Sequence, residues 1–134
     1  MKLNLAIISL ILLGLASCST PAQPSDNSPA AYKMMSVSEL QALRDSGEDF
    51  LFVNVHIPLE GNIPGTDFTV PFNQIEQNLD LFPEDKDARI VIYCRSDNMG
   101  HDAGQALVDN GYTDVSNLEG GYIEWKAQGL PFEE

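Results

Sequence analysis

The sequence predicts an α/β fold with a mostly parallel central sheet and helices on both of its faces. Segments typical of strands alternate along the chain with segments typical of helices. Two strand segments, 50–55 (FLFVNV) and 90–93 (IVIY), are almost wholly apolar, as expected for strands that are covered on both faces. A cysteine, Cys94, directly follows the second of them. Sites in parallel sheets form at the carboxyl ends of strands, so Cys94 is the first candidate for a functional residue.

The first half of the predicted domain begins with a short edge strand at 32–35, followed by a helix. Ser36 precedes the helix and has Glu39 three residues later, the pattern of a capping box. Gly47 is expected to end this helix. After the strand at 50–55, residues 57–65 contain two prolines and two glycines and predict a loop. This loop is expected to lie beside the loop after Cys94, because both follow the carboxyl ends of parallel strands.

A short strand is expected at 68–70, and a second helix after it. Asn73 is the predicted N-cap of this helix, Glu76 completes a capping box, and Pro83 ends it. The residues expected to face the core are Ile75, Leu79 and Phe82.

The second half is expected to contain the candidate site. After Cys94, a polar loop is predicted from Arg95 to Gly100, and a helix from His101 to about Gly111. The core-facing residues of this helix are expected to be Ala103, Ala106 and Leu107. A last strand is expected at 115–118.

The final predicted helix follows a Gly120-Gly121 turn. It carries Tyr122, Ile123 and Trp125 and ends at Gly129, and Trp125 and the glycine pair are expected to serve packing and turn formation.

The strand–cysteine–loop–helix order has a chemical consequence. Loop N–H groups and the positive end of the helix would point at Cys94 and lower the pKa of its thiol, which favours the nucleophilic thiolate. The structural alternative is that Cys94 is a small buried apolar residue.

Composition limits the possible partners. The formal net charge is −13 and the sequence pI is about 4.2, which excludes nucleic acid as a partner and gives no attraction to an anionic membrane surface.

The N-terminus predicts a signal peptide. Lys2 is followed by a 12-residue, mostly apolar stretch at 5–16, too short to span a membrane. It ends in Leu15-Ala16-Ser17-Cys18, which resembles the box of bacterial lipoproteins. The resemblance implies cleavage before Cys18, lipidation of Cys18 and a position in the cell envelope facing the periplasm. Ser19 stands where an inner-membrane retention signal has aspartate, which favours the outer membrane.

Three segments follow from this reading. They are a signal peptide at 1–17, a lipidated cysteine and flexible tether at 18–31, rich in proline and small polar residues, and a domain at 32–134. With Cys18 lipidated, Cys94 has no disulfide partner within the chain.

The folded part, from about Met34 to Phe132, resembles a rhodanese-like domain. The resemblance rests on the combination of FLFVNV followed by GNIPGT, VIYCRSDN, GYTDVSNLEGGYIEW and a closing GLP. It implies a three-layer sandwich in which Cys94 forms a persulfide and passes sulfane sulfur from a donor to a thiophilic acceptor.

The departures from the family pattern lie around this site. Asn54, His56 and Asn62 stand in place of aspartate, arginine and histidine. In the loop, Arg95 and Ser96 are retained and Asn98 is at a variable position. The other three loop residues stand where the family has glycine, arginine and serine, in that order: Asp97, Met99 and Gly100. The Asp97 carboxylate is expected to act against the lowering of the thiol pKa, and the loss of a cation together with the gain of an anion predicts weak activity with thiosulfate.

Related phosphatases clamp phosphate with an arginine six positions after the cysteine. That position is Gly100, so a phosphatase is not expected. His56 and His101 are the only histidines. They are either surface residues or, as imidazolium, assist the thiolate. The spacing of Cys94, His56, His101 and Asp97 matches no standard zinc pattern, so no metal or other cofactor is expected.

Two functions remain open from the sequence. The first is a lipid-anchored sulfurtransferase with a persulfide on Cys94, whose partners are a sulfur donor and a thiol or other acceptor. The second is a catalytically degenerate rhodanese fold that serves as a binding module. No protein partner can be named.

Overall fold

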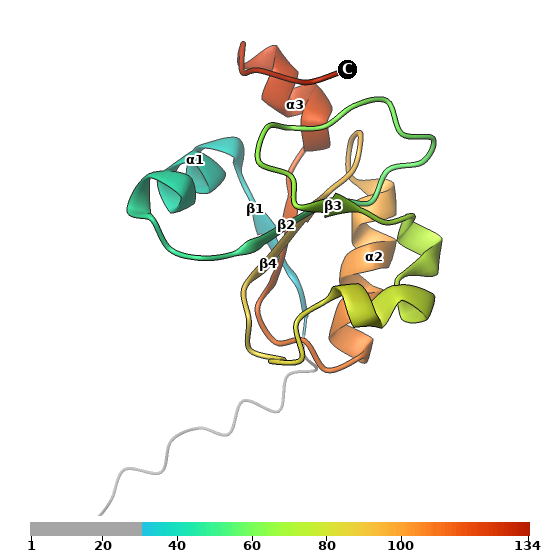
Figure 1. The fold of residues 1–134 in the computed structure, drawn as a ribbon. Helices are drawn as coiled ribbons and strands as arrows, with labels where there is room; N and C mark the ends of the chain where they lie inside the picture. Colours follow the sequence, from blue (N-terminus) through green and yellow to red (C-terminus); the bar gives the residue numbers. More distant parts are fainter. Residues whose placement is uncertain (1–30) are drawn as a thin grey trace, which may run out of the picture.

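A computed structural model describes residues 31–134 and contains a five-stranded sheet (Figure 1). The strands are β1 (Lys33–Met35), β2 (Leu51–Asn54), β3 (Phe68–Thr69), β4 (Ile90–Tyr93) and β5 (Val115–Leu118). Their order is β1-β5-β4-β2-β3, and every neighbouring pair is parallel. The predicted signal peptide, Cys18 and most of the tether lie outside the described residues. Within 31–134, none of the helices combines the length and the apolar character needed to cross a membrane.

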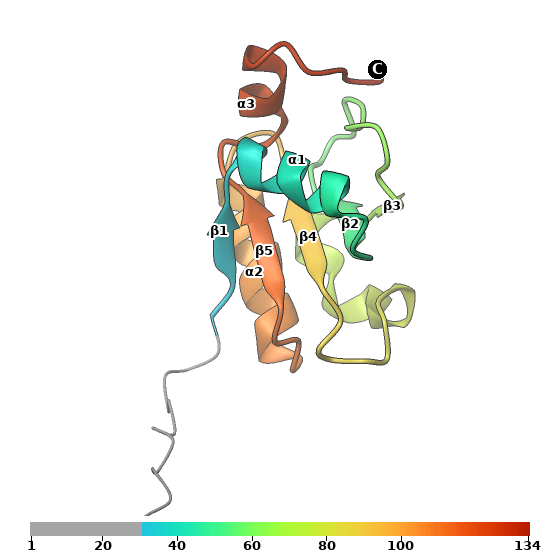
Figure 2. The same cartoon turned by 90° about the vertical axis from the view of Figure 1, so that its left-hand side faces the viewer.

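Helices cover both faces of this sheet, which gives the predicted three layers (Figure 2). On one face, α1 (Val37–Ser46) and α3 (Gly121–Ala127) pack with buried residues of the strands, among them Phe52 and Tyr93. On the other face, α2 (Asn98–Asp109) and two short 3₁₀ helices enclose a second core that contains Cys94. The apolar run of β4 fills both cores, and all four of its residues are buried.

The start and end of α1 confirm the sequence prediction. The Ser36 side chain accepts a hydrogen bond from the Glu39 backbone N–H, and the Glu39 carboxylate accepts one from the Ser36 N–H. Gly47 ends the helix with a φ of 72°, a conformation that glycine adopts without steric cost.

The predicted helix that starts at Asn73 is wrong. Two 3₁₀ helices, η1 (Phe72–Gln74) and η2 (Glu76–Leu81), replace it, and neither has a side-chain cap. The side chain of Asn78 donates a hydrogen bond to the Gln74 carbonyl at 2.8 Å, which takes the place of a backbone bond, and Asn78 itself has a non-helical φ of −125°. Of the three residues expected to face the core, Ile75 and Phe82 are buried and Leu79 is half-buried.

The helix after Cys94 begins three residues earlier than predicted, at Asn98 rather than His101. A backbone hydrogen bond from the His101 N–H to the Asp97 carbonyl closes its first turn at 2.9 Å. This turn looked like a loop because its polar side chains are directed away from the core, whereas its backbone faces Cys94.

The last strand and helix lie as predicted. Gly120, the N-cap of α3, and Gly121, its first residue, have positive φ values of 73° and 56°, and Trp125 is buried.

Candidate active site

Cys94 lies immediately after β4, at the carboxyl end of the central strand of the sheet. Its side chain is only 2 % exposed. The backbone N–H groups of Gly100, Ser96 and Met99 face its sulfur and favour a negative charge on it. These donors belong to the short link before α2 and to the first turn of α2, so the positive end of that helix also faces the sulfur. The result is a cradle suited to a negative charge.

Burial nevertheless outweighs the cradle, and the pKa of the Cys94 thiol is raised. Desolvation is the largest cause, the three N–H donors oppose it, and the charge of Asp97 adds to it. The prediction of a lowered pKa is therefore wrong, because the sequence shows the donors but not how deeply the sulfur is buried. The predicted direction of the Asp97 effect is confirmed.

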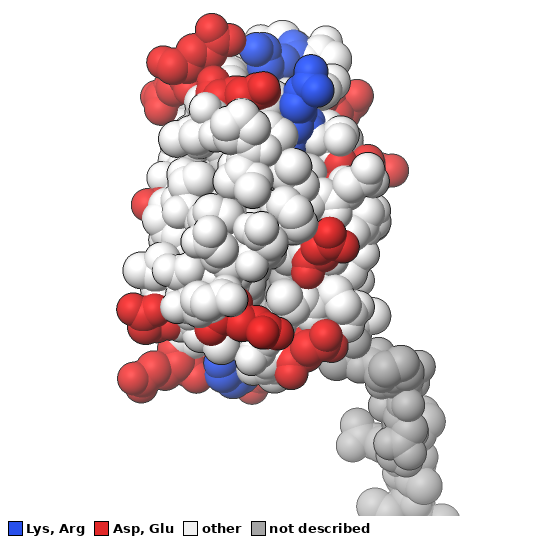
Figure 3. All heavy atoms as spheres, turned by 90° about the vertical axis from the view of Figure 1, so that its right-hand side faces the viewer, with Lys and Arg blue, Asp and Glu red and all other residues white. Residues whose placement is uncertain are grey.

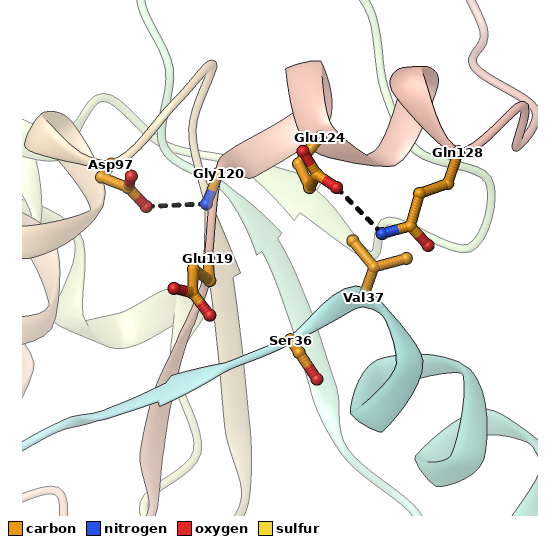
Figure 4. Close-up of a pocket in the computed structure, with 7 residues that line it drawn as sticks. All are labelled: Ser36, Val37, Asp97, Glu119, Gly120, Glu124 and Gln128. Atoms are coloured by element: carbon orange, nitrogen blue, oxygen red, sulfur yellow. Dashed lines mark hydrogen bonds between the residues drawn. The ribbon is translucent and has the colours of Figure 1, made fainter.

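Asp97 also has a structural role. Its Oδ1 accepts a hydrogen bond from the Gly120 backbone N–H at 2.9 Å and so ties the Cys94 loop to the start of α3 (Figure 4). The pocket drawn there, about 330 Å³ in volume, is lined by three carboxylates, those of Asp97, Glu119 and Glu124, and Cys94 does not line it.

Gly100 packs closely against β5. A Cβ at this position would lie 2.1 Å from Oδ1 of Asn117, a fully buried residue. Asn117 thus fills the space in which a serine side chain at position 100 would stand. This contact accounts for glycine at a position where the family pattern has serine.

A group of four side chains, here called the entrance cluster, lies next to Cys94 at the same end of the sheet. It consists of His56 and Glu60 from the β2–β3 loop, Arg95, and Tyr122 of α3. The Tyr122 hydroxyl donates a hydrogen bond to Glu60. The Glu60 carboxylate also lies 3.7 Å from Nε of Arg95 and 3.9 Å from Nε2 of His56. The contact between Glu60 and Arg95 confirms that the loop after β2 meets the Cys94 loop, and Figure 1 shows the β2–β3 loop passing the start of α3.

The two histidines lie in different places. The side chain of His56 is 8 % exposed, so it is not a surface residue, and burial lowers the pKa of its imidazole, which disfavours the alternative of an imidazolium. His101 is exposed and shares a hydrogen bond with the Tyr32 hydroxyl on the outer side of α2. Of the two, His56 belongs to the surroundings of Cys94. Residues 31–134 contain no group of three or more His, Cys, Asp or Glu side chains placed to hold a metal ion.

Asn54, at the end of β2, and Asn62, in the β2–β3 loop, form a neutral pair. The Asn54 amide donates to the Gly61 carbonyl at 2.9 Å and to Oδ1 of Asn62 at 3.0 Å, and its oxygen accepts from the His56 N–H at 3.0 Å. The two departures from the family pattern thus fit one another, and they fix the loop that carries Glu60.

Glu60 and the hydroxyl of Tyr122 were not recognised as site residues from the sequence. The loop was expected to lie beside Cys94, but no spacing rule shows which of its side chains turns inward. Tyr122 was identified only as a residue of the last helix.

Comparison with known proteins agrees with this geometry. The rhodanese-like domain model matches residues 29–128. A protein of Allochromatium vinosum named sulfurtransferase is 39% identical over 94 residues, which cover 68% of this chain and 84% of that protein. A tRNA uridine(34) hydroxylase of Erwinia tasmaniensis is 36% identical over 63 residues, which cover 44% of this chain and 18% of the hydroxylase.

Solved structures show the same fold. A rhodanese-like domain protein of Staphylococcus aureus has a TM-score of 0.64 at 27% identity, over 76% of this chain and 99% of that one. A Rhodopseudomonas palustris protein described as of unknown function and a possible tyrosine phosphatase has a TM-score of 0.67 at 28% identity, over 76% and 85% of the two chains. With its family match, its parallel sheet and its cysteine after the central strand, the chain belongs to the rhodanese-like domain family.

Proposed function

We propose that the protein is a sulfurtransferase in which Cys94 carries sulfane sulfur as a persulfide. The observation that carries this proposal is the cradle of three N–H donors, from Ser96, Met99 and Gly100, directed at a cysteine sulfur. Membership of a family that includes the Allochromatium sulfurtransferase supports it. Sulfur bound to Cys94 and released by cyanide is the direct test.

The proposed reaction has two steps. In the first, the Cys94 thiolate attacks the sulfane sulfur of a donor; a new S–S bond forms, the S–S bond of the donor breaks, and the leaving group takes its electron pair. With thiosulfate the leaving group is sulfite. In the second step, a thiophilic acceptor attacks the outer sulfur and Cys94 leaves as thiolate. The N–H donors stabilise the anionic sulfur in both states.

The raised pKa of Cys94 predicts how reactivity depends on pH. The reactive thiolate forms only as the pH rises through a value above the ordinary thiol pKa of about 8.5. We expect alkylation of Cys94 by iodoacetamide to keep accelerating beyond that pH. In Asp97→Asn, which removes the charge and keeps the oxygen bound to Gly120, the profile should move to lower pH. An unchanged profile in Asp97→Asn would show that this carboxylate does not act on the sulfur.

The Cys94 loop also predicts weak turnover of thiosulfate, a dianion. Arg95 is the one cation retained in the loop, and Asp97 opposes it. We expect the double variant Asp97→Asn/Met99→Arg to turn over thiosulfate about tenfold faster, because one anion is removed and one cation is added. Sulfite release measures this rate. If the double variant turns over thiosulfate no faster than the wild type, Asp97 and Met99 are not the cause of the slow turnover.

We further propose that the protein is anchored by lipid on Cys18 at the periplasmic face of the outer membrane. The support is the box at 15–18 and the serine that follows it. Cys18→Ala should release the protein from the membrane fraction into the soluble fraction of cells. A variant that stays in the membrane fraction would contradict anchoring through Cys18.

A binding module is the second candidate function. Two observations favour it: Cys94 is 2 % exposed, and the pKa of its thiol is raised. This candidate predicts that Cys94 takes up no sulfur from any donor.

A further inference from the structure

Glu60 is the residue in the entrance cluster that sequence reasoning and the proposed chemistry leave without a role. Its carboxylate touches the other three members of the cluster: the hydroxyl of Tyr122, Arg95 at 3.7 Å and His56 at 3.9 Å. The side chains of Glu60 and Arg95 are 46% and 58% exposed, so both face solvent. Their partners Tyr122 and His56 are buried, and the cluster therefore connects the interior near Cys94 with the surface.

The entrance cluster is linked to Cys94 by a backbone hydrogen bond and by the chain itself. The Tyr122 N–H donates a hydrogen bond to the Cys94 carbonyl at 3.0 Å, and Arg95 is the next residue in the chain. Burial and then the hydrogen bond to Glu60 raise the pKa of the Tyr122 hydroxyl, and the charge of Cys94 adds to this shift. A donor that approaches Cys94 past Arg95 would thus meet the Glu60 carboxylate.

Arg95 is the cation of the Cys94 loop available to attract an anionic donor, and Glu60 already pairs with it. The hydrogen bond from Tyr122, followed by the nearby Arg95 and His56, lowers the pKa of Glu60, so its carboxylate is charged at neutral pH. Arg95, Glu60 and Asp97 together carry a net charge of −1. At this end of the molecule, Lys and Arg side chains stand beside Asp and Glu (Figure 3).

We propose that Glu60 is a specificity-determining residue that hinders anionic reagents at Cys94 and favours sulfur donors that bear an ammonium group. Its carboxylate takes the place beside Arg95 and Tyr122 that an anionic substrate would otherwise occupy. The part that concerns sulfur donors rests on the proposed function, whereas the exclusion of anions does not.

The first test compares two alkylating reagents of nearly equal size, iodoacetate, an anion, and iodoacetamide, which is neutral. In both reactions the thiolate forms an S–C bond and iodide leaves, so the ratio of the two rates at Cys94 cancels any change in thiol pKa. We expect Glu60→Gln, whose amide oxygen can still accept from Tyr122, to raise the iodoacetate/iodoacetamide ratio about fivefold. The effect should shrink in about 1 M salt.

The matched control is Glu124→Gln. Like Glu60→Gln, it removes one negative charge. Glu124 lies on α3, however, and its carboxylate accepts a hydrogen bond from Gln128 rather than from the entrance cluster. An unchanged ratio in Glu60→Gln, or an equal rise in Glu124→Gln, would overturn the proposal. Urea unfolding of both variants checks that neither has lost its fold.

The second test uses two sulfur donors, thiosulfate and cysteamine persulfide, which bears an ammonium group. Sulfur uptake is measured as cyanide-labile mass on Cys94. From the persulfide, the outer sulfur bonds to Cys94 as the donor S–S bond breaks, and cysteamine leaves as a thiolate that takes up a proton. The wild type should load faster from cysteamine persulfide, and Glu60→Gln should load about fivefold faster from thiosulfate. If Cys94 takes up sulfur but Glu60→Gln leaves the donor preference unchanged, the role of Glu60 is refuted and the proposed function is not. If Cys94 takes up sulfur from neither donor, the proposed function is refuted. In that case the alkylation ratio still decides whether Glu60 excludes anions.

Discussion

Gly121→Ala is expected to lower the free energy of unfolding by roughly 2–5 kcal/mol and to abolish sulfur uptake at Cys94. Gly121 has a φ of +56°, where alanine is strained, and an added Cβ would lie 2.3 Å from the Cys94 carbonyl oxygen and 2.7 Å from backbone atoms of Arg95. These are backbone atoms, so relief requires the Cys94 loop itself to move. Urea unfolding measures the stability, and intact mass measures the sulfur uptake.

Gly129→Ala is the matched control. Gly129 follows the same helix with a φ of +76°, but nothing lies within 4 Å of a Cβ placed there. Gly129→Ala should lower the free energy of unfolding by roughly 1–2 kcal/mol, the cost of placing alanine in a left-handed backbone conformation. Sulfur uptake at Cys94 should be kept. Equal losses of stability in the two variants would mean that the contact with the Cys94 loop is not what requires glycine at position 121.

Asn54→Asp should lower the free energy of unfolding at pH 7 by roughly 3–5 kcal/mol, because it buries a charge that has no cationic partner and keeps one hydrogen-bond donor, the His56 N–H. Asn54 is fully buried, and its amide donates to two oxygens, those of Gly61 and Asn62. A carboxylate would face both oxygens as an acceptor, and this repulsion raises the pKa of the new aspartate in the folded protein. The cost should be smallest below about pH 3.9, the pKa in the unfolded chain, and reach its full size above the raised folded pKa.

Two variants test this explanation. Asn73→Asp makes the same chemical change at an exposed position and should alter stability by no more than about 0.5 kcal/mol. Asn54→Asp/Asn62→His should be more stable than Asn54→Asp alone, since an imidazole N–H can donate to the carboxylate. A cost at position 54 that is independent of pH would contradict a buried charge as its cause.

Most of the fold could be predicted because its signals are local. The apolar runs of β2 and β4 reflect burial on both faces of the sheet, and the Ser36–Glu39 box marks the start of α1. The prediction failed at residues 73–82, where the Asn78 side chain competes with the backbone for the Gln74 carbonyl. It also failed at the start of α2, whose first turn has the polar composition of a loop.

The candidate site was predicted in position but not in its electrostatics. The order strand–cysteine–helix places Cys94 and its donors, whereas the sign of the pKa shift depends on the depth of burial, a property of the whole fold. Likewise, Glu60 contacts Arg95 and Tyr122, which lie 35 and 62 positions later in the sequence. Contacts of this kind arise from tertiary packing, which no local pattern encodes.

The most direct test of the account is the intact mass of the purified protein after incubation with thiosulfate and, separately, with a small-molecule persulfide. We expect a gain of one sulfur atom from the persulfide, a smaller fraction loaded by thiosulfate, loss of the added mass with cyanide, and no gain in Cys94→Ser. A wild-type protein that gains no sulfur from either donor would contradict the assignment of Cys94 as a persulfide carrier and favour the binding module.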